Sequence, residues 1–210
     1  MAMQNLDLEE QEQLDALKAW WKQNGRLILF AVVAAAVAVA GMNGWRWYQR
    51  SQALEASRVY DVLAKAVRTG DAKGVRDAGG ALAEHYGSTL YASLGALDAA
   101  RFHFDRGELK SAKAQLEWVI ERSGAEDLRE LARLRLAAVL LDEKSYDAAL
   151  KALEPKPREA YAAQYAAMRG DILAAQGRVG EARAAYRESL EKADGALRDS
   201  VQMRLDGLGS

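Results

Sequence analysis

The residue types best suited to catalysis or metal binding are scarce in this chain. Its 210 residues include no cysteine and only two histidines, His85 and His103. A zinc hydrolase uses closely spaced histidines or a set of cysteines as ligands, and the sequence holds neither. His103 stands between Phe102 and Phe104 in a stretch of helical periodicity, where a packed or surface histidine is the ordinary role. The sequence therefore predicts no metal site and no thiol nucleophile.

Other catalytic patterns are also missing from the sequence. It has no glycine-rich phosphate loop with a following lysine and no Gly-x-Ser-x-Gly motif. Its carboxylates stand among basic residues, as Glu181 does near Arg183 and Asp105 beside Arg106, which is typical of solvated helix faces. We predict that the protein is not an enzyme and that it binds no cofactor.

Composition limits both the partners and the fold class. Lys and Arg number 29 against 30 Asp and Glu, so the chain lacks the positive charge that a phosphate backbone would require. We therefore expect no nucleic-acid partner. Alanine is abundant, and the only two prolines are Pro155 and Pro157. Such a composition favours packed helices, and we predict an all-α fold.

An apolar run near the N-terminus is long enough to cross a lipid bilayer. Nineteen uncharged residues, Leu27 to Trp45, separate Arg26 from Arg46. As a helix they would extend about 28 Å, close to the ~30 Å hydrocarbon core of a membrane. Aromatic residues that favour membrane interfaces flank the run: Trp20, Trp21, Trp45, Trp47 and Tyr48. We predict one transmembrane helix over residues 26–46.

Two alternatives compete with a membrane span. The run could belong to a cleaved signal peptide, with Ala38-Val39-Ala40 as the cleavage site, but the long and acidic segment before it is unlike a signal peptide. It could also be a buried core helix. A core helix normally keeps one polar stripe, whereas this run is apolar on every side until Asn43.

Charge alone does not decide the orientation of the span. Three basic residues precede it and three follow it: Lys18, Lys22 and Arg26 before, and Arg46, Arg50 and Arg58 after. Because Arg26 abuts the span and the N-terminal segment is short, the pattern favours an N-terminus on the inner side. The orientation stays open at this point.

Residues 1–25 form a separate amphipathic segment. Asp7 can cap a short helix in which Leu14, Leu17 and Trp21 share one face, and Asn24-Gly25 should break this helix before the span. The segment would lie at the level of the lipid headgroups or simply flank the span. We therefore divide the chain into residues 1–25, 26–46 and 47–210.

The region after the span has an internal repeat. Four alanines set its frame, at separations of 34, 37 and 33 residues: Ala78, Ala112, Ala149 and Ala182. Four residues after them stand large side chains: Leu82, Leu116, Leu153 and Tyr186. Twelve residues before them stand small ones: Ala66, Ala100, Ala137 and Gly170. Small residues recurring in this way let two helices approach closely, as tetratricopeptide repeats require.

The frame predicts about four helix-turn-helix repeats. It places the turn of the last repeat at Gly177, and it makes the first repeat the weakest, with Lys73 at the turn and Gly79-Gly80 inside the second helix. An apolar face over residues 197–208 suits a C-terminal capping helix. The alternative is an irregular helical bundle whose alanine spacing is accidental.

The first helix of each repeat would line a concave face that binds other proteins. The frame assigns to this face Leu97, Arg101, Phe104, Leu134, Ala138, Leu141, Ala167, Asp171 and Ala174. The set is mostly apolar, so it suits an apolar helix or an unfolded segment better than an acidic tail. Alternatively, several of these side chains are buried between helices.

The N-terminal sequence resembles that of a known family. It begins with the acidic stretch Leu6-Asp7-Leu8-Glu9-Glu10 and continues with Leu17-Lys18-Ala19-Trp20-Trp21-Lys22-Gln23-Asn24-Gly25, followed by one span and then the repeats. In this order and length the chain resembles the YfgM family, the ancillary subunit of the bacterial SecYEG translocon.

The resemblance implies a bacterial inner-membrane protein with a cytoplasmic N-terminus and a periplasmic repeat domain. It also implies partners: the SecYEG translocon, a membrane-anchored periplasmic prolyl isomerase chaperone, and unfolded client proteins, beside the lipid bilayer itself. The function that follows is assistance in the chaperone handover of secreted and envelope proteins. The alternative is a repeat scaffold for another cell-envelope assembly complex, with no role toward clients.

Overall fold

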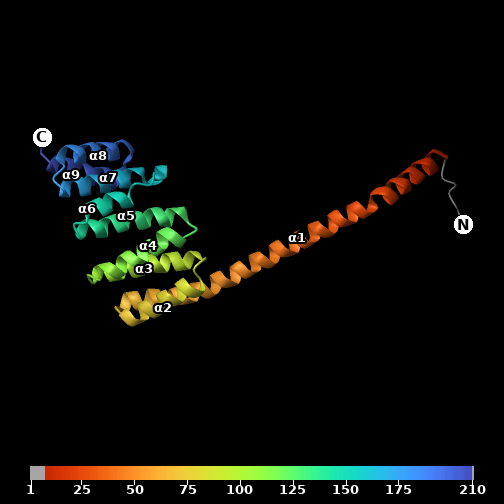
Figure 1. Ribbon diagram of the computed structural model, residues 1–210, viewed down its shortest axis with the longest axis horizontal. Helices are drawn as coiled ribbons and strands as arrows, with labels where there is room; N and C mark the ends of the chain where they lie inside the picture. The colour runs from red at the N-terminus through yellow and green to blue at the C-terminus, as the bar shows by residue number, and fades with distance from the viewer. Residues whose placement is uncertain (1–7, 210) are drawn as a thin grey trace. The chain divides into compact units, whose positions relative to one another are not determined.

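The computed structural model describes residues 8–209, a range built from helices and turns with no strand (Figure 1). The chain divides into two compact units, Met1–Ser51 and Gln52–Ser210. The helices are α1 (Leu8–Thr69), α2 (Ala72–His85), α3 (Leu90–Asp105), α4 (Leu109–Arg122), α5 (Glu126–Asp142), α6 (Tyr146–Ala152), α7 (Glu159–Ala175), α8 (Val179–Lys192) and α9 (Gly195–Gly207). The predicted all-α fold is confirmed.

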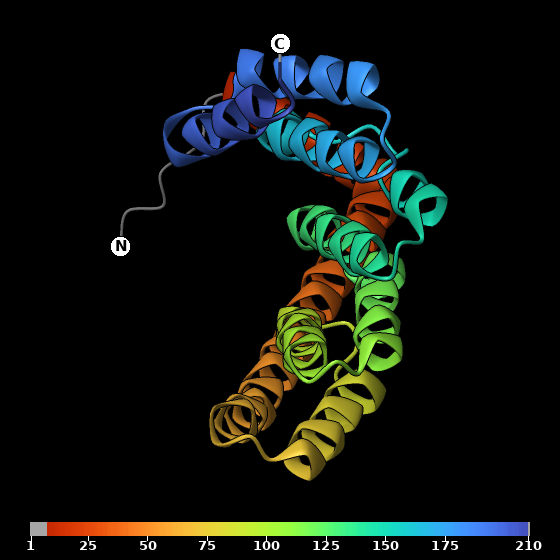
Figure 2. The ribbon, with the colours of Figure 1, turned by 90° about the vertical axis from the view of Figure 1, so that its left-hand side faces the viewer.

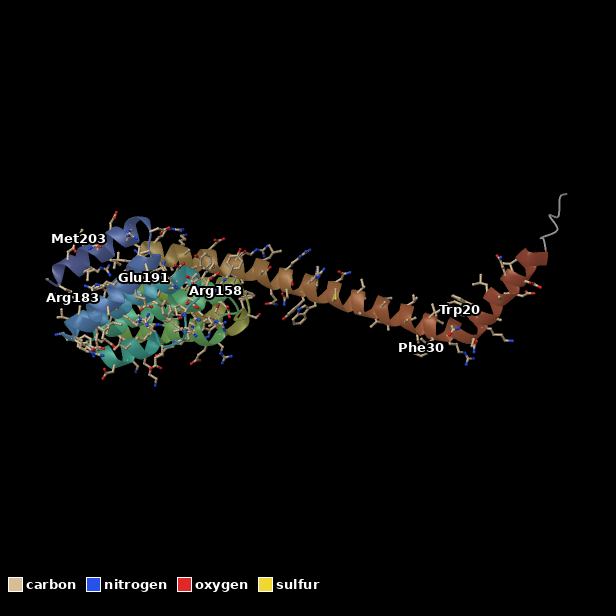
Figure 3. The ribbon with its side chains drawn as sticks, turned by 90° about the horizontal axis from the view of Figure 1, so that it is seen from above. Trp20, Phe30, Arg158, Arg183, Glu191 and Met203 are labelled. Carbon is tan, nitrogen blue, oxygen red and sulfur yellow. The ribbon has the colours of Figure 1, made fainter. Side chains whose placement is uncertain are left out.

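The described residues of the first unit all belong to α1, which contains the apolar run. Its most apolar 18-residue window has a mean hydropathy of 2.2 and is 0% buried, so length and composition suit a membrane span. Leu27, Phe30 and Trp47 are 74%, 80% and 72% exposed. Such side chains in water would be costly, whereas in lipid they are favourable. Figure 3 shows Trp20 and Phe30 projecting from this part of the helix.

The predicted break at Asn24-Gly25 is wrong, because α1 continues through both residues. The Asn24 side-chain amide donates to the Trp20 carbonyl at 3.0 Å, one helical turn back, and so bonds the helix instead of ending it. Gly25 packs beside the Trp21 ring, where a Cβ would lie 3.3 Å from Nε1. The predicted cap at Asp7 lies outside the described residues. Because α1 has no interruption at residues 25 or 46, the divisions 1–25, 26–46 and 47–210 stay predictions.

The described part of the second unit consists of four helix pairs followed by the single helix α9. Residues 52–69 of α1 pair with α2, α3 pairs with α4, α5 with α6 and α7 with α8. The first helices of neighbouring pairs also contact one another, α3 against α5 and α5 against α7. Figure 2 shows α3 and α5 on one side of this stack and α4 and α6 on the other. The predicted series of about four repeats is confirmed.

The repeat frame coincides with the core. The four alanines that define it are at most 6% exposed, and so are the residues twelve positions before and four positions after them: Ala66, Ala78, Leu82, Ala100, Ala112, Leu116, Ala137, Ala149, Leu153, Ala182 and Tyr186, with Gly170 buried as well. At Gly170 a Cβ would lie 2.4 Å from Tyr186 Cε1, so the ring occupies the space that glycine leaves free. Small and large side chains thus alternate across each helix pair, as the spacing predicts.

The turn inside each pair has a residue in the left-handed region. These residues are Gly70, Gly107, Lys144 and Gly177, with φ of 73°, 73°, 60° and 75°. In each turn the following backbone N–H donates to a carbonyl five residues back, as from Glu108 to His103 at 2.8 Å, which satisfies the end of the first helix.

Placing the first turn at Lys73 is therefore wrong. Lys73 lies inside α2, and the turn stands three residues earlier, at Gly70. Asp71 follows this glycine and caps α2, since its carboxylate accepts from the Lys73 and Gly74 N–H groups at 3.1 and 3.0 Å. The capping preference of the aspartate and the left-handed preference of glycine together outweigh the regular spacing.

The predicted capping helix is α9. Val201 is completely buried against the core of the fourth pair, and Leu197, Leu205 and Leu208 pack around it. Arg204 reaches back to Asp171 of α7, with Nη1 2.6 Å from Oδ2. The last helix pair therefore has its outer face covered.

Candidate functional site

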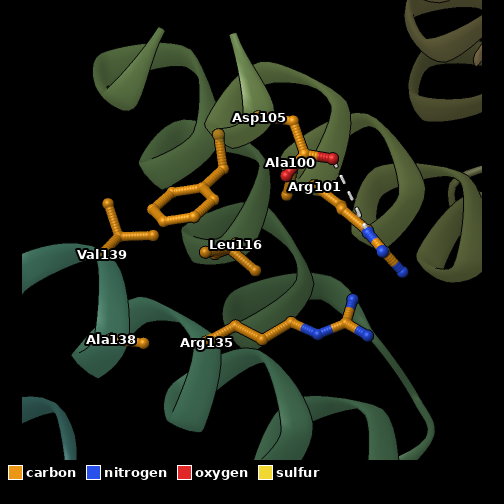
Figure 4. Close-up of a pocket in the computed structure, with 8 residues that line it drawn as sticks. Ala100, Arg101, Asp105, Leu116, Arg135, Ala138 and Val139 are labelled. Atoms are coloured by element: carbon orange, nitrogen blue, oxygen red, sulfur yellow. Dashed lines mark ion pairs between the residues drawn. The ribbon is translucent and has the colours of Figure 1, made fainter. Parts of the chain in front are cut away.

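A pocket opens between α3 and α5, the first helices of the second and third pairs (Figure 4). Its volume is about 320 Å³. Four of its lining residues come from α3, one from α4 and three from α5: Ala100, Arg101, Phe104, Asp105, Leu116, Arg135, Ala138 and Val139. The pocket exists because both helices carry alanine where they face each other, at Ala100 and Ala138, which leaves room between their backbones.

The floor of the pocket is apolar and rigid. Ala100, Leu116 and Val139 are 2%, 1% and 4% exposed, and they belong to the core shared by α3, α4 and α5. Phe104 is half-buried and packs against the same core. An apolar side chain entering the pocket would therefore contact fixed carbon atoms on several sides.

Two arginines stand at the mouth of the pocket. Figure 4 shows the guanidinium groups of Arg101 and Arg135 projecting on the same side. Arg101 Nε lies 3.8 Å from Asp105 Oδ2, which is an ion pair but too long for a hydrogen bond. Arg135 Nη1 donates to the Leu97 carbonyl at 3.4 Å, a long bond. Both guanidinium groups therefore keep donors that a bound anion could use.

The last turn of α3, which carries Phe104 and Asp105, is fixed by its neighbours. His103 Nδ1 lies 2.6 Å from Glu108 Oε2, and Arg106 Nε donates to the other carboxylate oxygen at 3.1 Å. These bonds, that from His103 first, hold the pKa of the Glu108 carboxyl below its ordinary value. The Arg106 guanidinium also lies over the Phe102 ring, 5.3 Å from its centre. These contacts hold the turn that carries two of the lining residues, Phe104 and Asp105.

The structure brings together three of the nine predicted groove residues. Arg101, Phe104 and Ala138 line the pocket. Leu97 is 3% exposed and lies in the core that α3, α4 and α5 share. Leu134 and Leu141 are half-buried and pack toward the core of the third pair. A binding role for each of these residues stays a prediction.

The three predicted residues of the fourth pair lie next to the capping helix. Ala167 is 4% exposed, and Ala174 packs against the same core as α9. Asp171 accepts a hydrogen bond from the Tyr186 hydroxyl at 2.8 Å and pairs with Arg204 of α9. Burial and this bond raise the pKa of the Tyr186 hydroxyl. The capping helix thus engages the acidic member of the predicted groove, whereas the open pocket lies between the second and third pairs.

The sequence frame missed Arg135 and Asp105. Arg135 follows Arg101 by 34 residues, whereas the frame shifts by 37 between these repeats and so matched Arg101 with Ala138. Arg135 and Ala138 stand three residues apart, one helical turn on the same face. A search for a repeated arginine at the commonest period would have found the pair.

The pocket contains the features of a binding site and lacks a reactive pair. Its only titratable lining groups are Arg101, Asp105 and Arg135. Within residues 8–209, no group of three or more acidic, histidine or cysteine side chains is placed to hold a metal ion. An apolar cavity with two cations at its mouth can bind an apolar side chain and an anion together.

Comparisons with known proteins agree with this architecture. A profile of the tetratricopeptide repeat-like domain matches residues 18–210. The ancillary SecYEG translocon subunit of Neisseria gonorrhoeae is 32% identical over 204 residues, covering 96% of this chain and 98% of that protein. The subunit of the same name from Haemophilus influenzae is 30% identical over 204 residues, with the same coverage. That of Escherichia coli is 32% identical over 201 residues, covering 95% of this chain and 96% of that protein.

Proposed function

The chain belongs to the tetratricopeptide repeat-like family that includes the ancillary SecYEG translocon subunits, and from this premise we propose that it is a membrane-anchored, protein-binding subunit associated with the Sec translocon. The relatives that carry this name match the chain along nearly its whole length, from the apolar helix through the repeats. Because the match covers the apolar helix as well as the repeats, it supports the same role for the whole chain and not only the same repeat fold.

The α3–α5 pocket is the observation that carries the binding role. It is open and apolar-floored, and it lies on the first helices of the repeats, the face that repeat proteins use for ligands. The family is one of interaction modules, and the lining residues provide contacts and charge without a nucleophile or a general base. We therefore propose an adaptor that binds proteins and performs no reaction of its own.

The exposed apolar stretch of α1 supports an anchor in the inner membrane. Trp20 and Trp21 stand before this stretch, and Trp45, Trp47 and Tyr48 follow it, all at least half exposed, as expected for side chains at two membrane interfaces. We propose that residues 26–46 span the membrane, with residues 1–25 in the cytoplasm and the repeats, within 47–210, in the periplasm.

The anchor and the pocket together suggest what the protein does at the translocon. An anchored repeat domain would have a high effective concentration beside the channel exit, so even a weak site could hold an emerging segment. We propose that the pocket binds such a client segment or a membrane-anchored periplasmic prolyl isomerase chaperone, and so assists the transfer of secreted and envelope proteins.

Site-specific photo-crosslinking in intact cells tests this function. A photoreactive residue at Phe104, inside the pocket, should crosslink to a translocon subunit, a periplasmic chaperone or an exported chain. The matched control is a photoreactive residue at Glu121, which is exposed on α4 and does not line the α3–α5 pocket. Adducts with unrelated envelope complexes and none with translocon components would instead favour an assembly scaffold.

The proposed topology has its own test. A protease cleavage site placed after residue 210 should be cut in spheroplasts by protease added outside, while the chain remains in the membrane fraction. Protection of this site until the membrane is lysed would place the repeats in the cytoplasm and reject the proposed topology.

A further inference from the structure

The α3–α5 pocket combines two chemistries that point to one kind of ligand. Below the mouth, buried carbon atoms of Ala100, Leu116 and Val139 form the floor. At the mouth, the guanidinium groups of Arg101 and Arg135 project on the same side (Figure 4). The volume of about 320 Å³ lies at the lower end of the range for ligand pockets, so it suits one or two side chains of a partner.

The charge of the pocket is positive, whereas the whole chain is nearly neutral. Its lining has two arginines and one aspartate, against a formal net charge of -1 for the full sequence. Asp105 does not neutralise the two cations, because its contact with Arg101 is 3.8 Å long and Arg101 remains 77% exposed. The long bond to the Leu97 carbonyl likewise leaves most donors of Arg135 available.

A wholly apolar ligand would fit this pocket poorly. Covering the mouth would remove water from two guanidinium groups without supplying an acceptor, which is costly. A wholly acidic ligand would leave the apolar floor in contact with water and would approach Asp105. A segment that carries both an apolar and an acidic side chain satisfies the floor and the mouth together.

We propose that the α3–α5 pocket recognises a segment of a partner protein in which an acidic side chain flanks an apolar one. The apolar side chain enters the cavity, and the carboxylate accepts hydrogen bonds from Arg101 and Arg135. This proposal rests on the proposed function, because it names the chemistry that the same pocket selects. It makes the site selective among protein segments instead of a general apolar groove.

Short fluorescent peptides binding to the full-length protein in detergent micelles provide the test. A host peptide contains a central Leu-Glu, and its variants replace this pair by Leu-Gln, Ser-Glu or Leu-Lys. We expect the Leu-Glu peptide to bind about tenfold more tightly than Leu-Gln, in line with a charge-assisted, partly buried arginine–carboxylate bond. The Ser-Glu peptide should lose affinity as well, because nothing fills the cavity.

Substitutions in the protein locate the preference. Arg101→Gln and Arg135→Gln should each reduce the preference of the protein for the Leu-Glu peptide over the Leu-Gln peptide. The affinity for the Leu-Glu peptide should also become less dependent on salt concentration. Arg122→Gln, which removes an exposed arginine of α4 that does not line the pocket, should leave the preference unchanged. Arg135→Glu should shift the preference toward the Leu-Lys peptide, a result that a misfolded variant would not give.

Several outcomes would overturn the proposal. Equal binding of Leu-Glu and Leu-Gln would make the pocket a plain apolar groove, and equal binding of Leu-Glu and Ser-Glu would make it a charged patch. The crosslinking experiment described above distinguishes failure of this inference from failure of the proposed function, because it asks whether translocon subunits are recovered with the wild-type protein. If they are recovered while the peptides show no preference, only the inference fails. If translocon subunits, chaperones and exported chains are all absent from the crosslinks, the proposed function fails, whatever the peptides show.

Discussion

The first and fourth helix pairs use the same turn but bring their helices together in different ways. In the fourth pair, Gly170 on the first helix leaves space for the Tyr186 ring of the second. In the first pair the glycine is on the second helix, where a Cβ on Gly74 would lie 2.9 Å from Ala66 Cβ. In both pairs the combined size of two facing residues sets the separation of the helices, but the glycine stands at a different repeat position in each pair.

The two pairs also differ in where the close approach lies. Gly170 stands seven residues before the turn residue Gly177, whereas Ala66 stands four residues before Gly70. The contact of the first pair is therefore about one helical turn nearer the connection. The larger side chains of Leu63 and Val75, both at most 1% exposed, are buried in the core of this pair.

Replacing Gly170 by alanine should have the largest effect. Its Cβ would lie 2.4 to 3.0 Å from three atoms of the Tyr186 ring, which is buried and cannot move freely. We expect the free energy of unfolding to fall by about 3 kcal/mol, measured by urea denaturation with circular dichroism. Gly80→Ala, at an exposed helical position with open space around it, is the control and should be neutral or stabilising. A small loss at Gly170 would mean that the fourth pair is as adaptable as the first.

Gly74→Ala should cost less, about 1–2 kcal/mol of unfolding free energy. Its Cβ would meet Ala66 Cβ at 2.9 Å and Asp71 Oδ2 at 2.6 Å, and the exposed aspartate can turn away only by straining its capping bonds to α2. A double-mutant cycle with Ala66→Gly sharpens the comparison. We expect a favourable coupling of about 1 kcal/mol, because removing one methyl group makes room for the other. Additive effects would show that the two residues do not set the spacing.

The third pair has a lysine at the turn position where the other three pairs have glycine, so a substitution there can raise the free energy of unfolding. Lys144 has a φ of 60°, where a Cβ is unfavourable. Lys144→Gly should raise the free energy of unfolding by about 0.5–1 kcal/mol, and Gly177→Ala should lower it by about 1 kcal/mol. Thermal unfolding of both variants measures the difference. Effects of the same sign would show that the two turns are not equivalent.

The smallest effect should be a change in acid sensitivity at the second turn. Bonds from His103 and Arg106 lower the pKa of the Glu108 carboxyl in the folded protein. The ionised group therefore contributes stability above the ordinary carboxyl pKa of about 4.3, and this contribution is lost as the pH falls through the lowered value. Glu108→Gln should unfold with a shallower pH dependence in this acidic range. An unchanged dependence would assign the loss to other carboxylates.

Much of the fold could be predicted because small and large residues recur at near-regular spacing in the sequence. Ala112, Ala149 and Ala182 recur at near-regular spacing, and all three are 0% exposed. The first turn was harder, because the glycine and the capping aspartate at Gly70-Asp71 stand three residues from the position that the spacing predicts. At Asn24-Gly25 the composition suggests a helix end, but α1 continues and the Asn24 side-chain amide donates to the Trp20 carbonyl within it.

The pocket was only partly predictable because it forms between repeats. Arg101, Phe104 and Ala138 follow from the helix face that the frame assigns. Arg135 does not, since it follows Arg101 by 34 residues, whereas the frame shifts by 37 between these repeats and so selects Ala138, one helical turn further along. Periodicity along a helix identifies which residues share a face, whereas the offset between neighbouring helices depends on how their side chains pack.

The buried Val201 of α9 has a consequence for how copies of the chain can associate. In a stack of similar helix pairs, each end resembles the interface that the next pair would occupy, so an open end can accept another molecule and begin a filament. Here Val201 and its leucine neighbours already occupy that interface, and the Arg204–Asp171 ion pair secures them. The α9 helix therefore leaves no uncovered interface of this kind on the outer face of the fourth pair, and removing α9 would expose one.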